Sequence, residues 1–459
     1  MKSLDINRFE RTSVLSLASI FSLRMLGLFM ILPVFSLYAA HFKYASPFLI
    51  GLALGVYGLT SAIFQAPYGL LSDHFGRKKM IIFGLIIFAL GSLLAGASHS
   101  IYGVIAGRAL QGAGAVGSTI LALLADLTRE EVRTKAMATI GMSIGASFML
   151  SLALGPVFIA HFNLADIFYL TAFLGVVAIG VLLWVVPSPK ASVFHRDQEI
   201  DLASLKAIVT RTDLLSLDFA VFILHAILMA TFVALPVAML HVTHISAHNQ
   251  WLVYLPVLVL AFILMVPMII IAEKKRKMRE VTLVAIGLLV IAELGFYFFS
   301  AHITAVIISL LCFFTAFTYL EGTLPSWISK VAPIETKGTA IGLYSSSQFF
   351  GAFVGGAFGG WLYGLKHFNA VFLFCVVMLC IWLLVVFNMK NPPYVATRML
   401  NVGKQSEQSA SKLEQALSKI KGVVQATVIA VDGIAYVKVD SKKVDDSKLF
   451  AYSVLTEGR

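Results

Sequence analysis

The sequence contains few charged residues and few cysteines. Asp, Glu, Lys and Arg together make up 13% of the 459 residues, whereas 59% are hydrophobic. A soluble domain carries roughly 25% charged residues, so this chain has too little polar surface to face water along its whole length. Its three cysteines, Cys312, Cys375 and Cys380, lie in apolar runs and match no zinc or redox spacing. The sequence therefore argues against a soluble protein, and it predicts no metal site and no cofactor.

Hydrophobic runs dominate the chain, and short polar loops separate them. A helix needs about 20 apolar residues to cross a bilayer, and twelve runs approach or exceed that length. We therefore predict an all-α polytopic membrane protein. The twelve transmembrane helices are expected at residues 14–38, 47–71, 80–98, 101–125, 136–160, 166–187, 215–240, 249–272, 281–299, 303–329, 338–363 and 370–389.

The basic residues are distributed unevenly between the two sides of these helices. The chain has a net charge of +11, and twenty-one lysines and arginines fall in the N-terminus and in the loops on one side. Lys43 and Lys366 are on the other side. Because cytoplasmic loops are enriched in Lys and Arg, we predict a bacterial inner-membrane protein with its N-terminus, central linker and C-terminus in the cytoplasm. This distribution explains the positive charge without nucleic-acid binding.

The helices divide into two sets of six. Residues 1–187 and 215–390 each hold six runs, and a polar linker at 188–214 joins them. The halves share weak sequence similarity at a spacing near 200 residues, since Asp73-x3-Arg77 in the first corresponds to Glu273-x3-Lys277 in the second. Internal repeats of this kind are typical of secondary transporters.

Residues 391–459 differ from the rest in being polar. Their pattern predicts a strand at 399–403, a helix at 406–421, two strands at 423–431 and 434–440, and a helix at 445–455. Asp432-Gly433 is a strong hairpin signal between the two later strands. The order β-α-β-β-α, with a final strand absent or unrecognised, predicts a small α+β domain.

Among the ionisable residues of the predicted spans, we single out five: Arg24, Arg108, His225, Glu293 and Glu321. Such residues are costly in a membrane, so we expect each to occupy a functional position that faces the central cavity. The best candidates for proton carriers are His225 and Glu321, because burial favours the neutral form of a carboxyl group. For each residue, a buried polar group with a fixed structural partner is the alternative.

The most specific motif is the loop Gly69-Leu-Leu-Ser-Asp73-His-Phe-Gly76-Arg77-Lys-Lys. It resembles the signature loop of the major facilitator superfamily, G-x-x-x-D-R/K-x-G-R-R/K, with His74 at a position usually basic. The resemblance implies the superfamily fold, with two bundles of six helices.

The resemblance also implies a conformational latch. Asp73 would face the positive N-terminal end of helix 338–363, while Gly69 permits close packing and Gly76 a tight turn. Arg77 would pair with Asp126, and Arg133 would join the cluster. Such a latch would favour the outward-open state.

Two further motifs resemble those of drug:proton antiporters in this superfamily. Arg108 is followed by Gln111-Gly112, like a motif whose arginine influences a proton-carrying acid. Gly155-Pro156 resembles the core of the antiporter motif, although Ser151 and Ile159-Ala160 depart from it. This partial agreement supports export as the direction of transport but does not settle it.

The C-terminal segment resembles a ferredoxin-like heavy-metal-associated domain. Members that bind metal carry C-x-x-C after the first strand, whereas this chain has Ser406 and Ser409 there. A serine hydroxyl does not replace a thiolate for soft metals. We therefore expect this domain to bind a regulator or to self-associate.

The leading interpretation is a proton-coupled secondary transporter that exports small lipophilic or drug-like solutes by alternating access. A uniporter or symporter for a metabolite is one alternative. A membrane sensor that signals through the C-terminal domain is another. An enzyme is not expected, since the sequence has no nucleophile–base or metal cluster. The expected partners are a small-molecule substrate, protons and the lipid bilayer.

Overall fold

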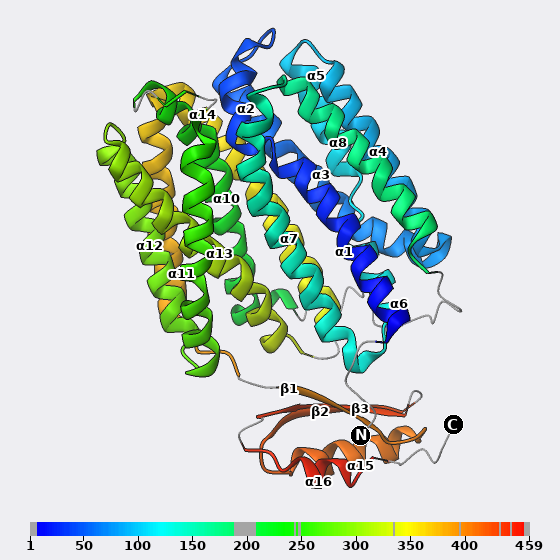
Figure 1. Ribbon diagram of the computed structural model, residues 1–459. Helices are drawn as coiled ribbons and strands as arrows, with labels where there is room; N and C mark the ends of the chain where they lie inside the picture. Colours follow the sequence, from blue (N-terminus) through cyan, green and yellow to red (C-terminus); the bar gives the residue numbers. More distant parts are fainter. Residues whose placement is uncertain are drawn as a thin grey trace.

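The first half of the chain forms one helical bundle in the computed structural model (Figure 1). The residues that the structure describes are 7–187, 208–242, 245–246, 249–333, 336–393, 396–430, 433–440 and 443–453. The bundle's helices are α1 (Arg8–Phe29), α2 (Leu32–Tyr38), α3 (Pro47–Phe75), α4 (Arg77–Ala97), α5 (Ile101–Ala113), α6 (Gly117–Leu127), α7 (Glu130–Ile159) and α8 (Leu164–Trp184), with a short 3-10 helix, η1 (Ala39–His41).

The second half forms a second bundle beside it. Its helices are α10 (Thr212–His241), α11 (Trp251–Lys274), α12 (Met278–Phe299), α13 (Ile303–Val331) and α14 (Lys337–Asn388). Helix α14 covers the eleventh and twelfth predicted helices, and it is interrupted at His367, where φ is +61°. Most of the predicted linker, residues 188–207, lies outside the described part of the chain.

Eleven helical segments among the described residues are long and apolar enough to cross a membrane. They match eleven of the twelve predicted spans, α1 with α2 and α5 with α6 each making one. The exception is 338–363, in the first part of α14, which contains seven glycines and three consecutive serines. These residues lower its hydropathy while allowing close helix contacts, as described below.

Local sequence signals set where several helices begin. Asn7 and Glu10 form a capping box at the start of α1, each side chain bonding the other's backbone N–H. Ser46 caps α3, and Pro47 occupies its first turn, where a missing N–H has no cost. Gly76 ends α3 with a φ of +94°, a conformation that favours glycine.

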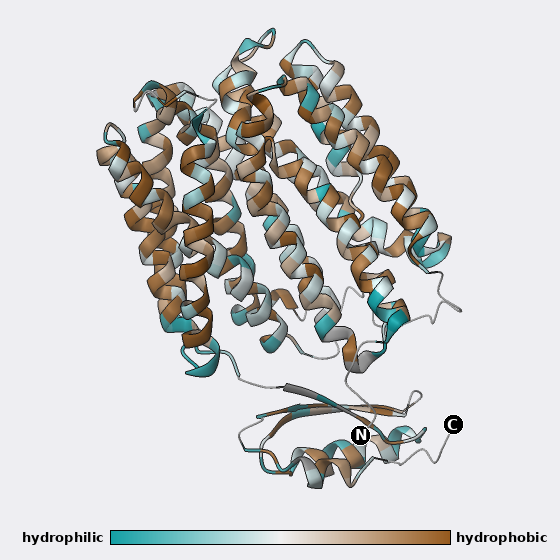
Figure 2. Ribbon diagram, in the orientation of Figure 1, coloured by the Kyte–Doolittle hydropathy of each residue, from teal (hydrophilic) through white to brown (hydrophobic). Residues whose placement is uncertain are grey.

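The two ends of the bundles differ in polarity. We call the end where α1 begins, with the α3–α4 and α11–α12 turns, the basic face; the other end is the opposite face. Hydrophilic residues gather at the basic face, and the helices between the faces are mostly hydrophobic (Figure 2).

The two halves share a buried core near the opposite face. One cluster of buried residues joins the second half to residues 30–39 and 50–54 of the first half. The buried residues of the first half near the basic face, such as Leu17, Ile81 and Leu124, belong to a separate cluster whose fully buried members all come from the first half. The halves therefore close against each other at the opposite face.

Small residues make this closure possible. Helix α3 contacts the first part of α14 so closely that a Cβ at Gly51 would lie 2.2 Å from the carbonyl oxygen of Gly356. A Cβ at Gly55 would lie 2.6 Å from the carbonyl oxygen of Phe353. We call this contact the glycine seam. Beside it, the Ser36 hydroxyl of α2 donates to the Phe232 carbonyl of α10 at 2.8 Å.

The C-terminal domain lies below the basic face (Figure 1). It contains β1 (Ala396–Asn401), α15 (Glu407–Ser418), β2 (Val423–Ile429), β3 (Ile434–Val439) and α16 (Asp446–Phe450). The sheet is antiparallel in the order β1-β3-β2, and β1 begins three residues before its predicted start. Both helices lie on the side of the sheet away from the bundles (Figure 1). A final strand would fall largely in residues 454–459, outside the described part.

Candidate functional site

A polar cluster lies midway along the second half, where three helices meet. His225 comes from α10, Glu321 from α13 and Gln348 from α14. The Nε2 atom of His225 lies 2.8 Å from Nε2 of Gln348 and 3.5 Å from Oε2 of Glu321. His225 is buried, whereas the Glu321 side chain is one-third exposed. The structure thus brings together the two predicted proton carriers, and it adds a glutamine between their helices.

Three contacts surround the His225 ring. Its Nδ1 lies 3.1 Å from the carbonyl oxygen of Val221, which can only accept, so Nδ1–H is the donor of this hydrogen bond. The other nitrogen, Nε2, lies 2.8 Å from the side-chain amide of Gln348 and 3.5 Å from the Glu321 carboxylate. A proton on Nε2 would attract that carboxylate.

Asp218 on α10 is a buried acid in this region that the sequence reasoning missed. Its side chain is buried, and it lies on the same helix as His225. The available signal was an aspartate inside the predicted helix 215–240. It lies only a few residues from the helix start, where a charge is easily attributed to the membrane surface.

Glu293 is remote from this cluster and fully buried in α12. Its Oε1 accepts a hydrogen bond from Thr231 of α10 at 2.7 Å. The Thr231 hydroxyl also lies 3.9 Å from the Cys375 sulfur in α14. Glu293 therefore has the fixed partner that the structural alternative requires.

The two buried arginines of the first half bond to neutral groups. Arg108 donates from Nε to the Ala53 carbonyl, from Nη2 to the Leu54 carbonyl, and from Nη1 to Gln111 Oε1 at 3.0 Å. Gln111 in turn donates to Ser92 at 2.7 Å. The guanidinium group of Arg108 therefore holds α5 to α3.

Arg24 donates a hydrogen bond at the break between α5 and α6 in the fourth span. Helix α5 ends at Ala113 and α6 begins at Gly117, and the Gly114 carbonyl between them accepts a hydrogen bond from the Val116 backbone N–H at 2.9 Å. Arg24 Nη2 donates to that carbonyl at 3.2 Å and to the Tyr57 hydroxyl at 2.8 Å. The side chain is 2% exposed, so in this conformation it does not line an open cavity.

The signature loop forms a charge cluster within the first half. Arg77 forms an ion pair with Asp73, donates from Nε to Asp126 at 3.3 Å, and donates to the Ser72 hydroxyl at 2.6 Å. Within the described chain, no hydrogen bond or ion pair joins Asp73 to α14. Arg133 lies in α7, but its side chain is outside the described part. The latch residues are thus assembled on one half while the halves are separate at this face.

The second half has a counterpart with reversed charges. Glu273, at the end of α11, accepts hydrogen bonds from Lys330 at 2.6 Å and from Ser326 at 3.3 Å. In the first half the loop supplies the base and the end of the fourth span supplies the acid, Asp126. In the second half the loop end supplies the acid and α13 supplies the base.

Of the remaining predicted motif residues, Gly155 serves close packing, whereas the close packing expected at Gly69 is not found. A Cβ at Gly155 of α7 would lie 2.2 Å from the Met30 carbonyl oxygen, so only glycine allows this approach to the first span. Pro156 follows near the end of the same helix. Gly69 has no such constraint, because a Cβ there would meet only the Ser118 hydroxyl, at 3.7 Å.

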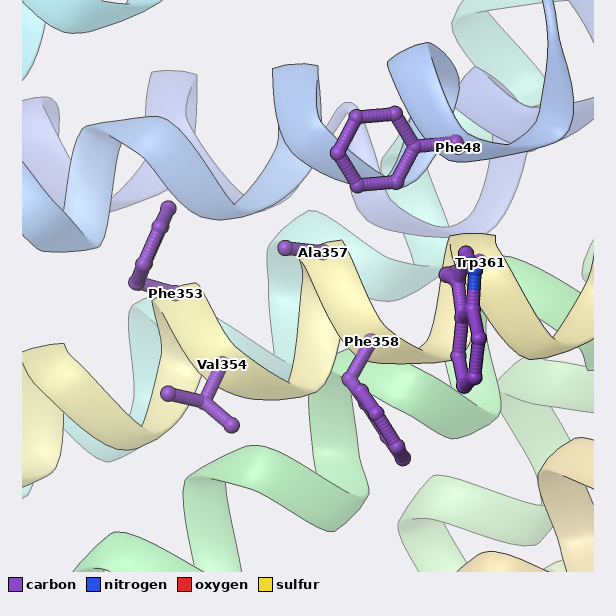
Figure 3. A pocket seen from close by; sticks show the side chains of 6 residues that line it. All are labelled: Phe48, Phe353, Val354, Ala357, Phe358 and Trp361. Atoms are coloured by element: carbon purple, nitrogen blue, oxygen red, sulfur yellow. The ribbon is translucent and has the colours of Figure 1, made fainter.

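An apolar pocket of about 280 Å³ lies beside the glycine seam, apart from the polar cluster (Figure 3). Phe48 reaches it from α3, and the other lining residues come from α14: Phe353, Val354, Ala357, Phe358 and Trp361. It contains no polar group, so it offers hydrophobic contact but no group that could bind a proton.

The C-terminal domain contacts the second half at the basic face. Arg276, in the α11–α12 turn, pairs with Asp440 after β3 through two hydrogen bonds, of 3.1 and 2.5 Å. Lys438 of β3 donates to the Ala332 carbonyl, just after α13, at 2.6 Å. Elsewhere in the domain, the Ser406 hydroxyl accepts from the Ser409 backbone N–H at 3.3 Å and caps α15. The serines at the metal-ligand positions of the related domains thus begin a helix here.

Comparisons with known proteins cover nearly the whole chain. A family model described as the Major Facilitator Superfamily matches residues 17–353 and 322–430. The chain is 42% identical over 433 residues to the inner membrane transport protein YajR of Escherichia coli, covering 94% of this chain and 95% of that protein. It is 30% identical over 154 residues to the class B tetracycline resistance protein of Escherichia coli, covering 33% of this chain and 37% of that protein. Among solved structures, a bacterial homologue of the human lysosomal transporter Spinster has a TM-score of 0.64 at 13% identity, covering 83% of this chain and 97% of that one.

Proposed function

Because the chain belongs to the major facilitator superfamily, we propose that it is a proton-coupled transporter that exports small lipophilic solutes across the inner membrane. The basic face is the cytoplasmic face, as the distribution of Lys and Arg predicts. With the halves closed at the opposite face, the described conformation faces the cytoplasm. The N-terminus, the central linker and the C-terminal domain then all lie in the cytoplasm.

The observation that carries the proposal is the position of His225 Nε2 between Gln348 and Glu321. Protonation of Nε2 changes this atom from an acceptor to a donor, so the Gln348 amide must turn or move away. The charged ring then attracts Glu321 across the 3.5 Å that separates them. Because the three residues come from α10, α13 and α14, one proton alters contacts among three helices. This is the differential interaction that coupling requires.

The charge clusters at the basic face support alternating access. Opening of the glycine seam would bring the basic ends of the two halves together. Asp73 could then meet the N-terminal end of α14, where the helix dipole favours an anion. Arg77 and Asp126 hold the loop in shape for this contact. During export the protein would therefore alternate between a conformation in which the glycine seam is closed and one in which the Asp73 latch is closed.

The function is tested with the full chain in proteoliposomes that enclose a pH-sensitive dye. A thermal-shift screen first identifies compounds that bind, and tetracycline is included because of the relative named above. Each binding compound is then applied as a gradient, and proton movement is recorded for the wild type, Glu321→Gln and His225→Gln. We expect proton flux in the wild type and its loss in both variants. Transport without proton movement would refute the coupling and favour a uniporter.

The docked C-terminal domain favours a second candidate, a membrane sensor. Arg276 and Lys438 connect the domain to the second half, so ligand-driven movement of that half would move the domain with it. Deleting the residues after 396 separates the two functions. A transporter should retain solute flux after the deletion, whereas a sensor would lose its output.

A further inference from the structure

Asp218 has no compensating partner although it is buried. Its side chain is 6% exposed, and neither carboxylate oxygen accepts a hydrogen bond from any described residue. Burying an unpaired carboxylate is strongly unfavourable, so a purely structural role does not explain the residue. Glu293 is the contrast, since its carboxyl group has the Thr231 hydroxyl as a donor.

Asp218 lies between the basic face and the His225–Glu321 pair. It precedes His225 by seven residues on α10, which is two helical turns on the same face of the helix, or about 10 Å along the axis. Helix α10 begins at Thr212 at the basic face, so Asp218 is the nearer of the two to the cytoplasm.

Tyr344 lies at a depth between the two positions. Its side chain is 5% exposed on α14, which packs along α10. Gln348, which contacts His225, follows Tyr344 by one turn of the same helix. Tyr344 is therefore about one turn nearer to the basic face than the His225–Gln348 contact, and Asp218 is about two turns nearer. The other titratable groups of this region are Glu321 on α13 and His225 on α10.

We propose that Asp218 is the group through which the His225–Glu321 pair exchanges protons with the cytoplasm, with the Tyr344 hydroxyl between them. This inference rests on the proposed proton coupling. A proton leaves Glu321 or His225 Nε2 for the Tyr344 oxygen while the proton of Tyr344 passes to the Asp218 carboxylate. Asp218 then releases its proton to water at the basic face. Tyr344 and Asp218 thereby return to their starting states, and the His225–Glu321 pair has lost one proton to the cytoplasm.

The test follows carboxyl protonation directly and needs no substrate. The full chain in lipid is subjected to a rapid pH change, and infrared spectroscopy records the C=O bands of protonated carboxyl groups. The bands are assigned by their loss in Asp218→Asn, Glu321→Gln and Glu293→Gln. We expect the Asp218 band to respond to pH, and we expect Asp218→Asn to slow the response of the Glu321 band on the order of 100-fold.

Two variants separate a relay from a structural effect. Asp218→Glu keeps a carboxyl group and should restore much of the rate, even if Asp218→Asn also weakens the fold. Glu293→Gln should lose its own band and leave the Glu321 rate unchanged. An Asp218 band that does not respond to pH would overturn the inference, as would an unchanged Glu321 rate in Asp218→Asn. If the Glu321 band does not respond to pH in the wild type, the proposed proton coupling is refuted, and that outcome is distinct from a failure of the role of Asp218.

Discussion

The glycine seam gives the sharpest test of the described conformation. A Cβ at Gly51 would lie 2.2 Å from the Gly356 carbonyl oxygen and 2.7 Å from the Gly360 Cα atom. Both neighbours are backbone atoms, which cannot turn aside as a flexible side chain can. Gly51→Ala therefore forces α3 and α14 apart wherever the seam is closed. Overpacking of this kind costs about 1–3 kcal/mol.

That cost falls only on the conformation in which the seam is closed. The ratio of outward-open to inward-open molecules should therefore rise by roughly 5–150-fold. Ala352 is a suitable reporter, because it is 6% exposed and lies on the seam against Gly58. We would introduce Ala352→Cys into a chain from which the three native cysteines have been removed. Labelling by a membrane-impermeant maleimide from outside should increase by the same factor.

The control is Gly287→Ala, since no atom lies within 4 Å of the Cβ position at Gly287 in α12. A second reporter, Leu123→Cys, lies in the fully buried core of the first half and should stay unlabelled unless the protein unfolds. Equal labelling of Ala352→Cys in the Gly51→Ala and Gly287→Ala backgrounds would refute the assignment of the seam as the closed outer gate.

Three further predictions concern other contacts. Arg276→Glu should weaken docking of the C-terminal domain by about 1 kcal/mol, and adding Asp440→Arg should restore docking. Protease protection of the segment that joins α14 to β1 measures both effects. If the double variant does not regain protection, the ion pair has no role in docking. Ser406→Ala should destabilise the C-terminal domain by about 1 kcal/mol through loss of the helix cap, observed as a lower unfolding temperature of that domain; no change would mean that the cap is not stabilising. Arg108→Met should lower the thermal stability of the full chain by removing two hydrogen bonds between α5 and α3, and unchanged stability would contradict that role.

Much of the architecture was accessible from sequence because it depends on local properties. The length of an apolar run determines whether it can span a bilayer, and the Asp432-Gly433 pair marks a hairpin wherever it occurs. Even the exception has a local cause: the glycines that lower the hydropathy of 338–363 are the residues that permit its contact with α3. The comparisons confirm the superfamily that the signature loop predicted.

The candidate site was accessible only in part. His225 and Glu321 could be identified from the sequence because they are ionisable residues within apolar runs. Their contact through Gln348 could not, because it depends on the depth and rotation of three helices. Asp218 was missed because its position near a helix start concealed its burial. Arg24 was predicted for the cavity, whereas in this conformation it satisfies the Gly114 carbonyl at a helix break that hydropathy does not reveal.

By itself, the sequence determined that this chain crosses a membrane in two related sets of helices, and it determined the motifs by which its superfamily is identified. It could do so because hydrophobicity, charge distribution and turn residues act over a few neighbouring positions. The tertiary structure decided which buried charges meet, which carboxyl group has no partner, and which end of the bundle is closed. Those outcomes depend on atoms brought within a few ångströms from segments far apart in the chain, and no local pattern encodes that distance.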